Sequence, residues 1–142
     1  MTGMAGKQFD LQVVTPRRVV FSGRIESISA PGVVGGFEVL YSHAPLLSSL
    51  RIGEVKVVDA QGAVTRYATS GGFVEVRNNQ VVMLAETAER VDEIDVERAK
   101  ASMTRARTRL SEKSSGTDME RARMALLRAL NRLKVSGSPT ME

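Results

Sequence analysis

The sequence predicts an α+β protein, with an N-terminal antiparallel β-sandwich of about ten strands followed by a C-terminal antiparallel hairpin of two helices. Composition changes after Arg90, because residues 1–90 hold all six aromatic residues and ten of the twelve glycines. Apolar residues alternate with polar ones before that point and recur every three or four residues after it. We therefore expect two structural units, a sandwich over residues 1–90 and a helical hairpin over residues 91–142.

Short strands are predicted in the first part by alternation and by closely spaced turns. Apolar and polar residues alternate over residues 9–13, 55–57 and 74–76. Asn78-Asn79 stands between two apolar runs, and asparagine tolerates a positive φ, so this pair predicts a tight hairpin. Many short strands joined by close turns are typical of an antiparallel sandwich or a flattened barrel.

Two helices are predicted in the second part by apolar residues spaced three and four positions apart, over residues 96–110 and 119–133. Each seam is too short to stand alone, so the helices are expected to pack on each other. Asp95 and Asp118 are the predicted N-caps, and residues 114–116 the predicted turn. The tail over residues 136–142 is expected to be loose.

The residue types that most active sites need are scarce. The chain has no cysteine and one histidine, which argues against a transition-metal site or a histidine triad. The histidine, His43, is interpreted as a hydrogen-bonded turn residue. No apolar run approaches the ~20 residues of a membrane span, and residues 1–10 lack the apolar stretch of a secretion signal. We expect a protein that is not an enzyme on its own.

A sequence repeat carries most of the positive charge. The net charge of +4 divides into +1 on residues 1–90 and +3 on residues 91–142. Residues 95–110 and 118–133 share eight identities in sixteen positions. The repeat aligns three arginines of each helix on one stripe beside the apolar seam. These are Arg98, Arg105 and Arg109 in the first helix and Arg121, Arg128 and Arg132 in the second.

The arginine stripes have more than one interpretation. They can form a solvated face with pairs inside each helix, or an anion site, because guanidinium groups bind phosphate and carboxylate oxygens bidentately. No aromatic residue lies in this part to stack on bases, which disfavours single-stranded nucleic acid and leaves phosphate-only contacts open. One hypothesis is thus a free-standing binding module whose basic hairpin holds nucleic acid or another polyanion.

Several segments, in this order, resemble the epsilon subunit of F-type ATP synthases. They are FDLQVVTP (9–16), SHAPLLSSLRIGEV (42–55), SGGFVEV (70–76), VVMLAETAERVDEIDVERA (81–99) and LLRALNRL (126–133). The resemblance covers almost the whole chain and implies the same fold, a sandwich followed by two helices. It implies a non-catalytic subunit of the central rotor stalk that couples proton-driven rotation to ATP synthesis and inhibits ATP hydrolysis through its hairpin.

The resemblance also implies partners. The sandwich would bind the gamma subunit and rest on the loops of the c-ring. The extended hairpin would meet acidic segments of the alpha and beta subunits, for which its net charge of +3 has the right sign. Nucleic acid is then no partner, and the membrane is reached only through the complex. The implied location is the cytoplasmic face of the bacterial plasma membrane, as a peripheral component.

Some bacterial members of that family bind ATP on the folded-down hairpin through an I/L-D-x-x-R-A motif, which stands here at residues 94–99. The resemblance carries the ATP site over to Glu89, Ile94, Asp95, Arg98, Ala99, Arg105, Arg128 and Arg132. The acids and the local backbone would orient adenine, and the arginines would neutralise phosphates from both helices. No cofactor is required, and ATP would act as a regulatory ligand.

The chain departs from the family in the loop expected to face the c-ring and gamma. Gly36 stands at the usual acidic position, and Glu38 is the expected substitute, because a shift of two residues keeps the same face of a strand. Tyr41-Ser42 stands where the family has Pro-Gly. The contact residues expected in this loop are Phe37, Glu38, His43 and Pro45.

Overall fold

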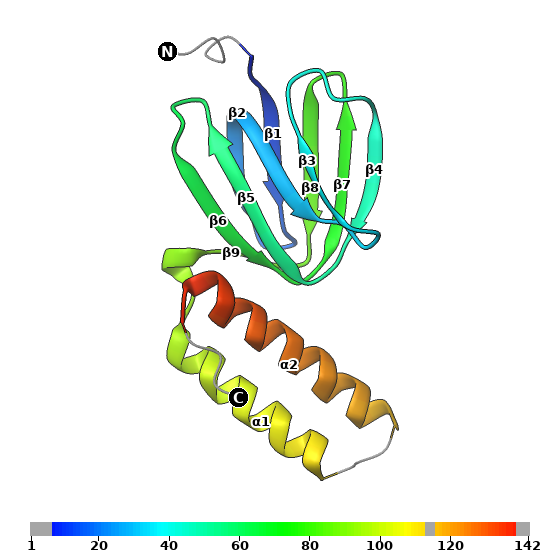
Figure 1. Ribbon diagram of the computed structural model, residues 1–142, viewed down its shortest axis with the longest axis vertical. Coiled ribbons are helices and arrows are strands. Elements are labelled where there is room, and N and C mark those ends of the chain that lie inside the picture. The colour runs from blue at the N-terminus through cyan, green and yellow to red at the C-terminus, as the bar shows by residue number, and fades with distance from the viewer. Residues whose placement is uncertain (1–6, 113–115, 139–142) are drawn as a thin grey trace. The chain divides into compact units, whose positions relative to one another are not determined.

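A computed structural model describes residues 7–112 and 116–138 of the chain. Its residues divide into two compact units, Met1–Arg90 and Val91–Glu142. The first unit is built of β-strands and the second of helices (Figure 1).

The described part of the first unit holds nine strands. They are β1 (Phe9–Val14), β2 (Val19–Pro31), β3 (Gly36–Val39), β4 (Leu46–Leu50), β5 (Gly53–Asp59), β6 (Val64–Thr69), β7 (Gly72–Arg77), β8 (Gln80–Ala85) and β9 (Ala88–Arg90). The strand order is β4-β7-β8-β1-β2-β5-β6-β9, with β3 paired to β2. Gly32 also bridges Leu50 at the end of β4, so the strand path curls back and encloses one apolar core (Figure 1).

The predicted fold class is confirmed, and the sheet differs from a purely antiparallel one at a single place. β1 pairs with β8 in parallel, from Asp10 opposite Gln80 to Val14 opposite Leu84. The other pairings of the described strands are antiparallel. A pairing between segments some 70 residues apart leaves no local signal, which is why alternation and turns do not predict its direction.

The apolar core follows from strand alternation. Phe9, Leu11 and Val13 of β1 are each almost fully buried, while Asp10 and Gln12 between them are exposed. The core is completed by residues of the other strands that alternate in the same way, among them Ile25, Ile28, Val55, Val57, Val74, Val76, Val81 and Met83. The inward set from several strands thus forms one contiguous cluster.

The tight hairpin predicted at Asn78-Asn79 is confirmed. It joins β7 to β8, with φ angles of 52° at Asn78 and 59° at Asn79, and Arg77 stands opposite Gln80. Two successive positive φ angles are the signature of a type I′ turn, whose twist matches the flanking strands. Asparagine adopts this conformation more readily than most residues, and the short turn fixes the register of β7 and β8.

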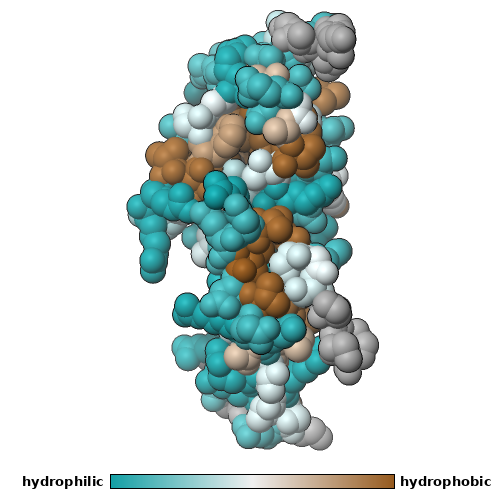
Figure 2. Space-filling view, turned by 90° about the vertical axis from the view of Figure 1, so that its left-hand side faces the viewer, coloured by the Kyte–Doolittle hydropathy of each residue, from teal (hydrophilic) through white to brown (hydrophobic). Residues whose placement is uncertain are grey.

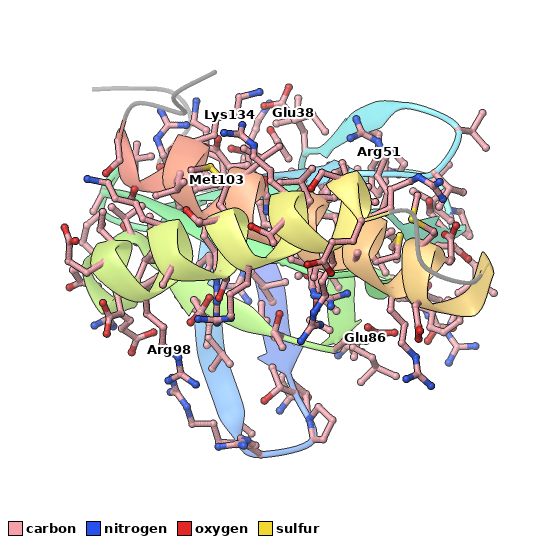
Figure 3. The ribbon with its side chains drawn as sticks, turned by 90° about the horizontal axis from the view of Figure 1, so that it is seen from below. Glu38, Arg51, Glu86, Arg98, Met103 and Lys134 are labelled. Atoms are coloured by element: carbon pink, nitrogen blue, oxygen red, sulfur yellow. The ribbon has the colours of Figure 1, made fainter. Side chains whose placement is uncertain are left out.

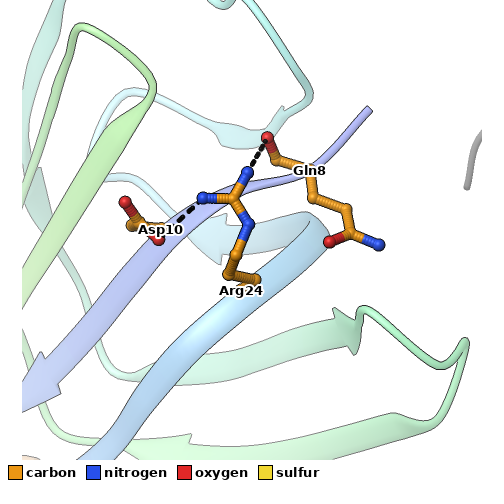
Figure 4. A network of polar contacts seen from close by, with 3 residues as sticks. All are labelled: Gln8, Asp10 and Arg24. Atoms are coloured by element: carbon orange, nitrogen blue, oxygen red, sulfur yellow. Dashed lines mark hydrogen bonds and ion pairs between the residues drawn. The ribbon is translucent and has the colours of Figure 1, made fainter. Parts of the chain in front are cut away.

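An exposed polar network ties the start of β1 to β2 (Figure 4). Arg24 Nη1 donates to Asp10 Oδ1 at 3.1 Å, and Arg24 Nη2 donates to the Gln8 carbonyl oxygen at 2.9 Å. Asp10 and Arg24 stand opposite each other in the β1–β2 register, so the contact is a cross-strand pair. Both side chains are about half exposed, and such a pair contributes only about 0.2–1 kcal/mol.

The second unit begins with a short 3-10 turn, η1 (Val91–Glu93), followed by α1 (Val96–Ser111) and α2 (Gly116–Ser136). Asp95 is confirmed as the N-cap of α1, because its Oδ1 accepts a hydrogen bond from the Arg98 backbone N–H at 3.0 Å. The N-cap predicted at Asp118 is wrong. α2 already begins at Gly116, so Asp118 lies within its first turn, where a carboxylate still stabilises the positive end of the helix.

Two smaller expectations at the helix ends also need correction. Gly116 belongs to α2 and not to the turn, whereas residues 114 and 115 lie outside the described residues. Ser136–Ser138 are ordered by a C-terminal cap and are not a loose tail. The N–H groups of Gly137 and Ser138 donate to the carbonyl oxygens of Lys134 at 3.1 Å and Leu133 at 2.9 Å, and Gly137 supplies the φ of 81° that this cap requires. Residues 139–142 lie outside the described residues.

Candidate functional site

The two helices pack as an antiparallel hairpin. Ala99 and Met103, from the first half of α1, share a core cluster with Ala129 and Leu133, from the second half of α2. Figure 3 shows Met103 between the two helices, whereas Arg98 points away from the seam. The start of α1 therefore lies beside the end of α2, and residues far apart in sequence come together there.

This packing brings together arginines that the sequence places in separate helices. Arg98 and Arg105 of α1 lie in the part of the hairpin that also holds Arg128 and Arg132 of α2, while Arg109 and Arg121 lie toward its other end. The repeat keeps the same offset from the seam in both helices, so antiparallel packing carries both arginine stripes on one face. Arg98, Arg105 and Arg128 are exposed, and Arg132 is half-buried.

Two ion pairs within the described helices lie away from this arginine face. Glu97 pairs with Lys100 at 3.8 Å, and Glu120 pairs with Arg123. Lys100 and Arg123 lie on the opposite side of their helices from the arginine stripes. Arg105 Nη2 donates to the neutral Ser102 Oγ at 3.1 Å. A basic face formed by arginines from both helices suits an anionic ligand or an acidic partner.

The other residues expected at the ATP site, four in number, have roles in the fold of the chain. Ile94 and Ala99 are buried, with exposed fractions of 8% and 0%, and Ala99 belongs to the hairpin core. The Asp95 carboxylate already accepts the capping hydrogen bond of α1. Glu89 lies in β9 of the sandwich unit, where it is half-buried and stands opposite Ala68. The motif residues thus shape the start of α1, and the arginines supply the charge.

The loop residues predicted to contact the c-ring and gamma differ in exposure. Phe37 is half-buried and packs against the sandwich core, so it serves first as a core residue. Glu38 is exposed on β3, on the same face as Gly36, as the two-residue shift requires. Pro45 is exposed, and the His43 Nδ1–H group donates to the Ala44 carbonyl oxygen at 2.7 Å.

One surface feature of the sandwich was not predicted. Leu47 of β4, Phe73 of β7 and Leu84 of β8 are exposed by 73%, 53% and 53%. Phe73 stands directly opposite Leu84, and Leu47 lies diagonally across from Phe73 on the same side of the sheet. We call these three residues the outer apolar patch. The alternation of residues along β7 and β8 could have indicated this patch. Phe73 and Leu84 are next to the buried Val74 and Met83, so they point to the opposite face of the sheet.

Other exposed apolar residues lie in several elements and loops, among them Val33, Val34, Leu40 and Tyr41. Figure 2 shows hydrophilic side chains over much of the visible face, with apolar side chains in separate patches among them. Within the part of the chain that the structure describes, no three acidic, histidine or cysteine residues are grouped so that they could hold a metal ion. None of the described helices is long and apolar enough to cross a membrane.

Two family models match consecutive parts of the chain. The ATP synthase delta/epsilon chain beta-sandwich domain matches residues 8–91, and the long alpha-helix domain of the same chains matches residues 92–137. Curated relatives agree. The chain is 50% identical over 105 residues to an ATP synthase epsilon chain of Desulforamulus reducens, covering 74% of this chain and 79% of that one. It is 46% identical over 111 residues to that of Pelotomaculum thermopropionicum, covering 78% and 82%.

Solved structures share the fold. A chain of the Euglena gracilis mitochondrial ATP synthase matches with a TM-score of 0.79 and 22% identity, covering 87% of this chain and 78% of that one. A chain of the Tetrahymena thermophila mitochondrial ATP synthase central stalk and c-ring matches with a TM-score of 0.65 and 14% identity, covering 89% and 95%.

Proposed function

This chain belongs to the ATP synthase delta/epsilon family, as an epsilon chain, and we propose that it works in the central rotor stalk. There it couples proton-driven rotation to ATP synthesis and restrains ATP hydrolysis through the hairpin of α1 and α2. Catalysis belongs to other chains, since an epsilon chain is a non-catalytic subunit. The observation that supports this role is that one family accounts for both units in order, from residue 8 to residue 137.

Each unit offers a surface that suits the proposed partners. The outer apolar patch suits the gamma subunit, because apolar side chains exposed together are typical of protein interfaces. The loop that carries Glu38, His43 and Pro45 is proposed to face both the c-ring and the gamma subunit. The arginine face of the hairpin suits acidic segments of the alpha and beta subunits. The resulting location is peripheral, on the cytoplasmic face of the bacterial plasma membrane.

Removing residues 91–142 is expected to raise ATP hydrolysis by the assembled complex severalfold, because the sandwich can still join the stalk while the restraining hairpin is gone. The sandwich has its own apolar core, so it is expected to fold without the helices. The measurement is the hydrolysis rate of complexes rebuilt with the full or the shortened chain, with subunit content checked in both. A rate that does not change would contradict the inhibitory role.

ATP is proposed to bind the arginine face as a regulatory ligand. A ligand held only by the folded-down hairpin would stabilise that state by about 2.7 kcal/mol at a hundredfold excess over its Kd. Calorimetry of the full chain with Mg-free ATP is expected to show binding that Arg128→Ala weakens about tenfold, the value of one charge-assisted hydrogen bond. Arg123→Ala is the matched control, because Arg123 pairs with Glu120 on the other side of α2. An absence of binding heat up to millimolar ATP would refute this ligand.

A further inference from the structure

The loop between β3 and β4 contains a turn whose conformation its own sequence does not favour. The His43 backbone N–H donates to the Leu40 carbonyl oxygen at 3.1 Å, which closes a β-turn over Leu40–His43. Ser42, the third residue of this turn, has a φ of 63°. Tyr41 before it is not among the residues with positive φ, and this combination is typical of a type II turn, in which glycine normally supplies the positive φ. Serine rarely adopts it, so the turn depends on support from outside.

The support comes from the side chain of Asn79. The Ser42 backbone N–H donates to Asn79 Oδ1 at 2.7 Å, across 37 residues of sequence. Asn79 is itself held firmly, because it belongs to the two-residue turn between β7 and β8 and its carbonyl oxygen accepts the Asp10 N–H at 3.1 Å. A short hydrogen bond from a rigid hairpin can therefore hold the Leu40–His43 turn in the conformation that Ser42 alone disfavours.

The turn carries two exposed side chains suited to a protein partner. Leu40 is 47% exposed and Tyr41 is 44% exposed. Tyrosine at the apex of a fixed turn supplies a large contact area with few rotatable bonds, a common feature of binding loops. The loop also leads directly into β4, whose second residue, Leu47, belongs to the outer apolar patch. The Leu40–Tyr41 pair is thus continuous in sequence with the surface proposed to meet gamma.

We propose that Asn79 is a positioning residue for the gamma interface, and that its side-chain amide presets the Leu40–His43 turn so that Leu40 and Tyr41 meet the gamma subunit. This inference rests on the proposed function. Presetting raises affinity because the loop need not be ordered when the subunits associate. Asn79 itself need not touch gamma.

The test compares three variants of the full chain in binding to the purified gamma subunit. Asn79→Gly removes the amide and still accepts the φ of 59°, so it is expected to weaken binding about tenfold while leaving the hairpin intact. Asn79→Asp keeps an oxygen acceptor and is expected to bind within about twofold of the unaltered chain. Adding Ser42→Gly to Asn79→Gly is expected to restore most of the affinity, because glycine adopts the turn without support.

Amide hydrogen exchange of the Ser42 N–H supplies a second readout. It is expected to be faster in Asn79→Gly than in the unaltered chain and unchanged in Asn79→Asp. Unchanged gamma binding by Asn79→Gly would overturn this inference and leave the proposed function standing. Failure of the unaltered chain to bind gamma would instead contradict the proposed function, and this inference with it.

Discussion

Replacing Gly72 by alanine is expected to destabilise the sandwich by about 3 kcal/mol or more. Gly72 opens β7 with a φ of 138°, and an added Cβ would stand 2.0 Å from the Leu84 carbonyl oxygen and 2.9 Å from the Ala85 Cα. Both neighbours are backbone atoms of β8, so no side chain can move aside. The β7–β8 pairing would have to shift.

Gly62→Ala provides the matched control for this substitution. Gly62 also has a left-handed backbone, with a φ of 84°, but nothing lies within 4 Å of the position its Cβ would take. Gly62→Ala is therefore expected to lower the free energy of unfolding only by the cost of a left-handed backbone at alanine, about 1 kcal/mol. A larger loss of stability in Gly72→Ala than in Gly62→Ala is expected because only the added Cβ at position 72 meets the backbone of β8.

Urea unfolding followed by tyrosine fluorescence reports the sandwich, because both tyrosines lie in that unit and Tyr67 is buried. A destabilisation of 3 kcal/mol corresponds to a fall in Tm of about 12 °C or more for a domain of this size. Equal destabilisation by Gly72→Ala and Gly62→Ala would contradict a clash between the added Cβ at position 72 and the backbone of β8.

The sequence predicts those features of the fold that depend on neighbouring residues. Alternation around Phe9 and Val74, the hairpin at Asn78-Asn79 and the cap at Asp95 are all local, and each is confirmed. The spacing of the helical seams likewise predicts the packing of α1 on α2. In each case the physical signal lies within single strands, turns or helices.

Features that depend on distant segments escaped prediction. The parallel pairing of β1 with β8 and the hydrogen bond from Ser42 to Asn79 join residues far apart in the chain. The prediction of Asp118 as an N-cap is wrong for another reason. A capping residue and a first-turn acid have the same composition signal, and only the start of α2 at Gly116 distinguishes them.

The sequence predicts the arginines of the candidate site, but it does not predict which strands lie side by side in the sandwich. The arginine trios follow from a repeat that is visible in the sequence, and antiparallel packing then brings Arg98 to the end of the hairpin that holds Arg132. The outer apolar patch required knowledge of which strands are adjacent. Leu47 and Phe73 are 26 positions apart, and only the pairing of β4 with β7 places them together.

Phe73→Asp is expected to lower affinity for the gamma subunit by about a hundredfold or more with little effect on folding. Central apolar residues of an interface contribute about 2–4 kcal/mol, and the aspartate would add the cost of burying a charge. Phe73 is 53% exposed in the free chain and stands between Ser49 and Leu84 on the outer face of the sheet. The core beneath it, including Val74, is not disturbed.

Val64→Asp distinguishes the outer apolar patch from general surface hydrophobicity. Val64 of β6 is 51% exposed, close to the value for Phe73, but β6 lies near the other end of the strand order from β4 and β7. The same charge introduced there is expected to leave gamma binding within about twofold, because charges on non-interface surface have little effect on association at moderate salt. Thermal unfolding of both variants checks that the sandwich is intact. Equal losses of affinity in Phe73→Asp and Val64→Asp would contradict a gamma interface at the outer apolar patch. A loss found in Phe73→Asp alone would support an interface at this patch.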